Sequence, residues 1–487
     1  MPNMEENRPS KEEQREISKR KKRKPHYQFV LFPIVLVLSI TDMSRTIGRH
    51  YATLSNVGLS SSSSFFTVDA FQPMARTVTR ASGGSRKFRL RNIFSRRASS
   101  NDGPAAESTY DMVVVGGGSA GLTAAKFASG TLKKSVLILE EERLGGDCTW
   151  TGCVPSKSLL SKAKAAKMAR NYAIQQHAID HSSGGDETFS DNQRSKSRAN
   201  FGKVQEYFRR VQEEIYEEDD SPRALEKFGI ETKEGQKARL VSPTKLSFES
   251  GSTTTTVEAT EGILLCTGAK PNRPSSIPGL SDVDYVTYEE IWTRDFGGSL
   301  PHKWTVVGAG PIGCELAQAL SRLGASVTII TGRSGRLLPS VDDAEVSELM
   351  KQVFEEEENI KVIEGSLSKV EAKGGEIGEK SSSHVAFVET TSKESVSVEG
   401  EALLLSIGRK PNTSGLGLES LGIELDPKSG GIAVDSTLKT SVNGIYAAGD
   451  CTGDKQFTHY AGTFASMGTE ALGFGILFGM IAHVFNV

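Results

Sequence analysis

The stretch that decides the fold reads Tyr110-Asp111-Met112-Val113-Val114-Val115-Gly116-Gly117-Gly118-Ser119-Ala120-Gly121. Its first half is an apolar run typical of a buried strand, and its second half carries the spacing G-x-G-x-x-G at Gly116, Gly118 and Gly121. The residues after it, 123–129, have the composition of a helix. A strand, a glycine turn and a helix in this order predict a dinucleotide-binding unit, in which backbone N–H groups at the helix N-terminus approach a pyrophosphate.

A second apolar run, residues 135–139, strengthens this interpretation because it ends in an acid, Glu140. A carboxylate at the end of the second strand can accept a hydrogen bond from a ribose hydroxyl of the nucleotide. The alternative, a glycine-rich turn that binds nothing, would need neither the second strand nor its terminal acid.

The same pattern recurs downstream, where the apolar residues 304–307 lead into Gly308, Gly310 and Gly313. A helix is expected from Glu315 and a strand over 326–330. Two complete fingerprints in one chain predict two dinucleotides, since the combination is much rarer by chance than either fingerprint alone.

The end of this later strand bears on cofactor choice. An NAD site has an acid about 20 positions after the glycines, whereas this chain has Thr331-Gly332-Arg333, with Arg336 nearby. Guanidinium groups bind a 2′-phosphate through paired hydrogen bonds, so Arg333 and Arg336 favour NADPH over NADH. The alternative is that both arginines are solvated and the site accepts either cofactor.

Further strand and turn segments complete the pattern. Residues 262–269 and 403–412 each read as a strand followed by a tight turn, and 444–450 as a buried strand that ends in Asp450, whose carboxyl needs a polar partner such as a ligand hydroxyl. Together with the two fingerprints, they predict an α/β fold with two Rossmann-like, three-layer domains on parallel sheets.

Two cysteines lie close together in the segment that follows Glu140. Cys148 and Cys153 are five positions apart and point to different sides of a regular helix, so a bond between them requires a distorted turn before a helix that Pro155 can begin. A thiolate near a helix N-terminus and near Lys157 has a lowered pKa and is the reactive species. The alternative is that both are core cysteines without a disulfide. That packing role is expected of Cys266, Cys314 and Cys451.

The run G-G-x-C-x-x-x-x-G-C-V-P-S-K at residues 145–157 resembles the active site of the class I pyridine nucleotide-disulfide oxidoreductases, which include dihydrolipoamide dehydrogenase, glutathione reductase and mercuric reductase. With the other motifs, the resemblance covers about residues 108 to 470. It implies that the second domain is inserted in the first, so that the first comprises 108–280 and 411–470 and the second 281–410. It also implies FAD in the first domain and a nicotinamide cofactor in the second. Carried over by motif, it implies a flavin-facing thiolate at Cys153, an outer cysteine that attacks substrate at Cys148, and Lys157 beside the flavin with Glu315 as its partner. It also implies cofactor contacts at Thr267, Gly268 and Ala269, at Gly408, and at Asp450 on the ribityl chain.

The composition limits the class of protein and its partners. The chain has 487 residues, of which 37% are hydrophobic and 24% charged, and this predicts a protein with two or three soluble globular domains. Its net charge of -2 argues against a nucleic-acid partner. Five cysteines are too few for a secreted disulfide framework. No metal site is expected.

Residues 1–107 are predicted to be a presequence outside the fold. The apolar stretch 29–40 suits a signal peptide, and 71–101 has eight Arg or Lys and no acid, as organelle transit peptides do. The junction at residues 68–73 resembles the Ala-Phe-x-Pro boundary of plastid presequences in algae with secondary plastids. Plastid delivery is therefore expected, and a membrane anchor at 29–40 or an incorrect gene start are the alternatives.

The middle and the end of the chain carry further expectations. We expect a polar surface loop over 177–200 and an exposed helix over 202–219. Members of the family are homodimers. In them a dimerisation domain follows the last flavin motif, and its His-Pro dipeptide supplies the catalytic acid/base to the partner's active site. This chain has no His-Pro dipeptide and ends in an apolar tail, 471–487. The tail reads as a membrane-associating helix, a helix packed on the flavin domain, or translated intron. We expect slow turnover of disulfides and faster reduction of quinones or dyes, because the partner-supplied acid/base is missing.

The leading functional prediction is a flavoprotein that passes electrons from NAD(P)H through FAD to a Cys148–Cys153 disulfide, and on to a small disulfide or a metal ion. One alternative is a membrane-attached FAD-dependent dehydrogenase that reduces quinone, although such enzymes do not need the cysteine pair. The other is a flavin-binding protein without disulfide turnover.

Overall fold

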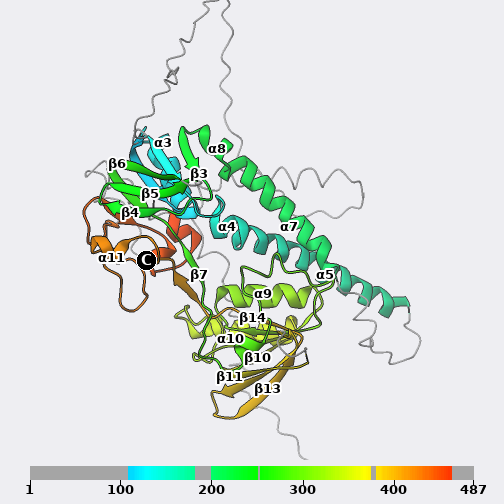
Figure 1. Ribbon diagram of the computed structural model, residues 1–487. Helices are drawn as coiled ribbons and strands as arrows, with labels where there is room; N and C mark the ends of the chain where they lie inside the picture. The colour runs from blue at the N-terminus through cyan, green and yellow to red at the C-terminus, as the bar shows by residue number, and fades with distance from the viewer. Residues whose placement is uncertain (1–107, 181–198, 251–252, 375–379, 463–464, 466–487) are drawn as a thin grey trace, which may run out of the picture. The chain divides into compact units, whose positions relative to one another are not determined.

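The computed structural model describes residues 108–180, 199–250, 253–374, 380–462 and 465 (Figure 1). The predicted presequence, the apolar tail and most of the predicted polar loop lie outside these ranges. Within the described ranges, no helix is both long and apolar enough to span a bilayer.

A seven-stranded sheet forms the first nucleotide-binding domain, with the strand order β3-β2-β1-β6-β5-β4 and with β16 also paired to β6. Its parallel pairs join β1, β2, β3, β6 and β16, and its antiparallel pairs join β4, β5 and β6. The strands are β1 (Ser108–Val115), β2 (Val136–Leu139), β3 (Ile230–Lys233), β4 (Arg239–Ser242), β5 (Lys245–Ser250), β6 (Thr253–Leu265) and β16 (Ile445–Ala447).

Both faces of this sheet are covered, which explains the continuous apolar run in β1. Met112 and Val114 pack in one core cluster with the alanines of α3 (Ser119–Gly130), while Val113 and Val115 pack in a second cluster on the opposite face. Successive strand residues point to opposite sides, so a strand covered on both sides must be apolar at every position. The helix predicted from Thr123 begins four residues earlier, at Ser119.

The cysteine-bearing segment forms two helices separated by a turn. Helix α4 (Gly146–Trp150) ends before Thr151 and Gly152, and α5 (Cys153–Asp180) begins at the second cysteine. The distorted turn that the spacing predicts is therefore present. Cys148 lies within α4, and Cys153 is the first residue of α5.

The helix predicted over 202–219 is present, but the prediction that it is exposed is wrong. It consists of α7 (Phe201–Ile215) and a π-helical turn, η1 (Tyr216–Asp220), and α8 (Pro222–Glu226) follows. In α7 the side chains of Phe201, Gln205, Phe208 and Gln212 are buried. Their spacing of three and four residues places them on one face, and the charged residues occupy the other faces. Figure 1 shows α7 running beside α5, with which it packs.

The second nucleotide-binding domain has a parallel four-stranded sheet in the order β10-β9-β8-β14 and an antiparallel sheet in the order β11-β12-β13. The strands are β8 (Lys303–Val307), β9 (Ser326–Ile330), β10 (Ile360–Ile363), β11 (Gly365–Ala372), β12 (His384–Thr390), β13 (Ser395–Gly400) and β14 (Ala402–Leu405). The helices are α9 (Pro311–Arg322), α10 (Ala344–Gln352) and the π-helical turn η3 (Val353–Glu357).

A short two-stranded ribbon joins the domains. Strand β7 (Ala269–Pro271) leads out of the first domain and pairs antiparallel with β15 (Arg409–Pro411), which leads back. The chain then adds β16 to the first sheet beside β6. This confirms the predicted α/β class with the second domain inserted in the first. The remaining short elements are η2 (Leu280–Asp282), α11 (Leu418–Leu421) and η4 (Asp450–Thr452).

Candidate active site

A cavity of about 870 Å³ lies at the carboxyl ends of the parallel strands of the first sheet. Its volume is in the range of cofactor sites, and this end of a parallel sheet is where α/β proteins bind ligands. Most residues predicted for the first nucleotide site line it, namely Gly116, Gly118, Glu140, Cys148, Thr267, Gly268, Ala269 and Asp450. Gly121, Cys153 and Lys157 do not line it.

The glycines of the first fingerprint have different roles. A Cβ on Gly116, whose φ is +103°, would lie 2.3 Å from the carbonyl oxygen of Cys266, and one on Gly121 would lie 1.9 Å from the carbonyl oxygen of Gly116. A Cβ on Gly118 would meet nothing nearer than the Cα of Gly146, at 3.8 Å. Two of the glycines therefore serve the packing of the turn, and Gly118 leaves room at the cavity, where α3 begins.

The acid at the end of β2 is held by backbone donors. Glu140 Oε2 accepts from the N–H of Gly117 at 2.6 Å, and Oε1 accepts from the N–H of Glu142 at 2.8 Å. Burial raises the pKa of Glu140 and also that of Asp450. These two half-buried carboxyl groups at the cavity are suited to accept hydrogen bonds from the hydroxyl groups of a ligand.

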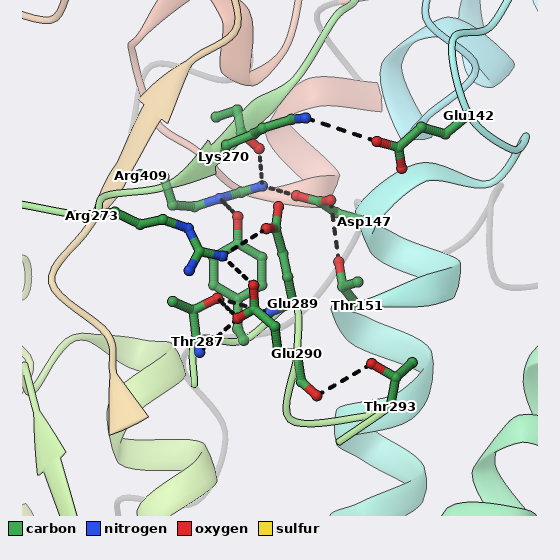
Figure 2. Close-up of polar contacts among 12 residues, drawn as sticks. Glu142, Asp147, Thr151, Lys270, Arg273, Thr287, Glu289, Glu290, Thr293 and Arg409 are labelled. Atoms are coloured by element: carbon green, nitrogen blue, oxygen red, sulfur yellow. Dashed lines mark hydrogen bonds and ion pairs between the residues drawn. The ribbon is translucent and has the colours of Figure 1, made fainter. Parts of the chain in front are cut away.

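Arg409 connects three predicted motifs at the cavity. Its guanidinium is paired with Asp450 and with Asp147, the residue before the first cysteine, and its Nε donates to the hydroxyl of Tyr288 at 2.9 Å. Figure 2 shows Arg409 and Asp147 facing each other, with Thr151 near Asp147. Since β15 carries Arg409, the strand that returns from the second domain also anchors the cysteine-bearing segment.

The two cysteines ionise differently. The hydrogen bond with Cys148 is the largest cause that lowers the pKa of Cys153, to about 6, and burial acts against it. The same hydrogen bond and burial raise the pKa of Cys148 well above its usual value. One proton is therefore shared between the two thiols, and Cys153 carries the thiolate near neutral pH.

Two further residues favour this thiolate. Thr458 Oγ1 lies 3.3 Å from Cys153 Sγ, and its hydrogen bond lowers the pKa of Cys153. The charge of Lys157 also lowers this pKa, while that of Glu315 raises it. Lys157 Nζ donates to Glu315 at 2.8 Å, so the partner implied by the family resemblance is in place.

The second fingerprint repeats the geometry of the first. A Cβ on Gly308, whose φ is +103°, would lie 2.1 Å from the carbonyl oxygen of Ser406, and one on Gly313 would lie 2.0 Å from that of Gly308. A Cβ on Gly310 would meet nothing within 4 Å. The middle glycine again leaves space before a helix, here α9, and the turn can admit a second pyrophosphate.

The two arginines that follow β9 are not equivalent. Arg336 Nη2 donates to the carbonyl oxygens of Pro339 and Val341, at 3.2 and 3.0 Å, so its guanidinium is used to hold the loop. Arg333 is exposed, and no hydrogen bond or ion pair with another described residue holds its side chain. Of the two arginines, only Arg336 therefore has a guanidinium that holds the loop.

Sequence reasoning placed the glycines, both acids, the cysteines and the Lys157–Glu315 pair, but it missed Thr458, Arg409 and Gln212. Gly408, a predicted cofactor contact, has a φ of +98° and precedes Arg409. A Cβ on Gly408 would meet nothing within 4 Å. Arg409 lies inside the predicted strand-turn segment 403–412, whereas Thr458 follows the last predicted strand segment, 444–450. The remaining cysteines, Cys266, Cys314 and Cys451, are buried in the core, as predicted.

Comparison with known proteins gives a consistent result. Residues 110–465 match the sequence model described as pyridine nucleotide-disulphide oxidoreductase. A mercuric reductase from Staphylococcus aureus is 31% identical over 356 residues, which cover 73% of this chain and 58% of that protein. A dihydrolipoyl dehydrogenase from Bacillus subtilis is 30% identical over 365 residues, which cover 72% of this chain and 69% of that protein.

The chain spans only about half the length of some relatives, since the aligned part is 50% of a mercuric reductase from Bacillus cereus. Among solved structures, an HOCl-induced flavoprotein disulfide reductase from Escherichia coli, studied as a Cu(II) complex, is similar with a TM-score of 0.60 and 21% identity. The match covers 75% of this chain and 71% of that chain. This likeness supports the fold.

Proposed function

Because the chain belongs to the pyridine nucleotide-disulphide oxidoreductase family, we propose that it passes electrons from NADPH through FAD to a disulfide between Cys148 and Cys153. From there, the electrons pass to a small disulfide or a metal ion. The observation that carries the proposal is that Cys148, which lines the cavity, is hydrogen-bonded to Cys153, whose pKa is lowered to about 6 while that of Cys148 is raised. If Cys148 and Cys153 were unrelated core cysteines, their pKa values would have no reason to shift in opposite directions.

The residues at the cavity fit FAD. Gly118 leaves space at the start of α3, where free N–H groups and the helix dipole favour a pyrophosphate. Glu140 suits a ribose hydroxyl, and Asp450 suits the ribityl hydroxyls. Bound FAD would supply two-electron redox chemistry between a nicotinamide and the cysteine pair.

The protein's own residues then handle thiols and protons. Reduction of the disulfide yields Cys153 as thiolate, which Thr458 and Lys157 stabilise, and Cys148 as thiol with the shared proton. For attack on a substrate disulfide, the proton must leave Cys148 Sγ, and the thiolate at Cys153 is the nearest group to receive it. The attack releases a substrate thiolate, which takes the proton from Cys153, and the Cys153 thiolate then closes the protein disulfide with release of the second substrate thiolate.

The acceptor is proposed from chemistry and from the relatives. A dithiol with a nucleophilic outer cysteine reacts with a disulfide, and thiolates also bind soft metal ions. The names of the relatives, mercuric reductase and dihydrolipoyl dehydrogenase, cover both classes. Quinones need no cysteine pair, so their reduction should persist when a cysteine is replaced.

The test is to count thiols in the full-length protein after anaerobic addition of NADPH. Denatured protein should show five thiols after NADPH and three before it, because the chain has five cysteines. Cys148→Ser should show four thiols under both conditions. Flavin reduction by NADPH without any change in the thiol count would overturn the proposal and favour direct flavin acceptors.

A further inference from the structure

Three consecutive backbone carbonyl groups between the two cysteines are held by side chains from elsewhere in the chain. Gln212 Nε2 donates to the carbonyl oxygen of Thr149 at 3.0 Å and to that of Trp150 at 2.7 Å. Trp292 Nε1 donates to the carbonyl oxygen of Thr151 at 2.8 Å. The turn from Cys148 to Cys153 is thus fixed from outside.

These carbonyl groups need outside partners because of where they lie. Helix α4 has five residues, so its last carbonyl groups have no donor within the helix. Thr149 is buried, and its hydroxyl donates to Asp220 Oδ2 at 2.7 Å. A buried carbonyl group without a donor is destabilising. The amide of Gln212 supplies both hydrogen atoms of its NH₂ group to two of these carbonyl groups.

The buried face of α7 positions the amide of Gln212 at the turn. Gln205, Phe208 and Gln212 lie on one face of the helix and are 8%, 0% and 5% exposed. Gln205 Nε2 donates to the carbonyl oxygens of Trp292 and Arg294, at 3.2 and 2.9 Å. The two glutamines therefore have the same chemistry and similar burial, but only Gln212 bonds the turn between the cysteines.

We infer that Gln212 is a positioning residue for the redox pair: by fixing the turn between Cys148 and Cys153, it favours closure of their disulfide. A disulfide forms only when the two cysteines lie within a narrow range of separation and orientation. Holding the backbone near that geometry removes conformational freedom that closure would otherwise have to remove, and it raises the effective concentration of one thiol at the other. This inference rests on the proposed function of the pair.

The equilibrium between dithiol and disulfide measures this effect directly. Full-length protein is equilibrated at pH 7.5 with mixtures of reduced and oxidised dithiothreitol. The two thiols form a disulfide, and oxidised dithiothreitol takes up their two electrons and two protons to become its dithiol. The reaction is quenched with a maleimide in denaturant, the free thiols are counted by mass spectrometry, and the oxidised peptides are mapped.

Gln212→Met keeps the length of the side chain and removes its donors. We expect it to require an oxidised-to-reduced dithiothreitol ratio about tenfold higher for half oxidation, which corresponds to about 30 mV for this two-electron couple. Trp292→Phe, which removes the donor to Thr151, should shift the ratio in the same direction. Gln205→Met is the matched control and should stay within about twofold of the unmutated protein, because the carbonyl groups it holds lie outside the turn.

The outcomes separate the inference from the function on which it rests. If the unmutated protein never loses two thiols, the proposed redox pair is wrong. If the pair oxidises normally and Gln212→Met leaves its equilibrium unchanged within twofold, the positioning role is wrong. An equal shift in Gln205→Met would also overturn it, since displacement of α7, or of Trp292, whose carbonyl group Gln205 holds, would then explain the effect. Should Gln212→Met fail to fold, Trp292→Phe decides in the same way.

Discussion

Lys157 Nζ donates to both carboxylate oxygens of Glu315, at 2.8 and 3.1 Å, and so joins the first residues of α5 to the second fingerprint helix. The two charges act in opposite directions on Cys153, since Lys157 lowers its pKa and Glu315 raises it. The lysine side chain is 65% exposed, so solvent screens its effect. The pair therefore adjusts the thiolate without setting its pKa alone.

Replacing either member of this pair should change the reactivity of Cys153 in opposite directions. Lys157→Met should slow alkylation of Cys153 by iodoacetamide at pH 6 by about two- to fivefold, because it removes a screened positive charge. Glu315→Gln should leave the rate unchanged or raise it slightly. Rates are followed on reduced protein by mass spectrometry of the cysteine peptides. A slower rate in both variants would mean that the ion pair acts by holding α5 in place.

The pH profile of alkylation tests the division between the cysteines. The pKa of Cys153 is lowered to about 6, so its thiolate is lost as the pH falls through 6 and is fully formed above it. The rate at Cys153 should fall about tenfold per unit below pH 6 and reach a plateau above it. Cys148 should react only at much higher pH, because its pKa is raised. A profile in which Cys148 reacts first would reverse the two roles.

Thr458→Val removes the hydroxyl that lies 3.3 Å from Cys153 Sγ and keeps the shape of the side chain. The pKa of Cys153 should rise, because one hydrogen bond to the thiolate is lost, and alkylation at pH 6 should slow by about three- to tenfold. Thr458→Ser retains the hydroxyl and should restore most of the rate. If serine and valine behave alike, the contact does not stabilise the thiolate.

The fingerprint glycines predict a contrast between binding and stability. Gly118→Ala should fold normally, since its φ of −84° is ordinary and its Cβ has space, and should weaken FAD binding by about tenfold or more as the methyl group occupies the approach to the helix N-terminus. Gly121→Ala would place a Cβ 1.9 Å from a backbone oxygen and should lower the free energy of unfolding by about 3 kcal/mol or more. Thermal unfolding and FAD titration distinguish the two, and equal loss of stability would contradict the assignment.

The choice of nicotinamide cofactor should depend on Arg333 and not on Arg336. Arg333→Ala should lower kcat/KM for NADPH by about 10- to 100-fold, the value of a charge-assisted contact to a phosphate, with little change for NADH. Arg336→Ala should affect both cofactors alike, because this side chain holds the carbonyl oxygens of Pro339 and Val341. Steady-state rates with a dye as acceptor measure both. An equal loss for both cofactors in Arg333→Ala would remove the argument for NADPH.

The residues predicted well from the sequence are those whose geometry is local. Gly116, Gly121 and Glu140 lie within one strand-turn-helix-strand unit, so their spacing alone determines how they meet. The same holds for the turn between Cys148 and Cys153, because two cysteines five positions apart cannot form a disulfide within a regular helix.

The residues that were missed act across large separations in the sequence. Thr458 meets Cys153 across 305 positions, and Arg409 meets Asp147 across 262. No spacing rule relates such pairs. Charges dominate the composition of α7 and favour an exposed helix, whereas a glutamine on an apolar stripe is a signal of a buried partner that lacks a donor.

The placement of β16 beside β6 has a consequence for biosynthesis. Residues Ile263–Leu265 of β6 leave the ribosome long before Ile445–Ala447, with which they pair, and all strands of the second domain are made in between. The inserted domain can therefore complete its sheets first, while the first sheet still has an unpaired apolar edge. The chain between β6 and β16 is long, so pairing of these two strands is slow. Exposed strand edges of this kind promote aggregation. We expect nascent chains that end shortly before Ile445 to depend on chaperones and to become independent of them once β16 has emerged.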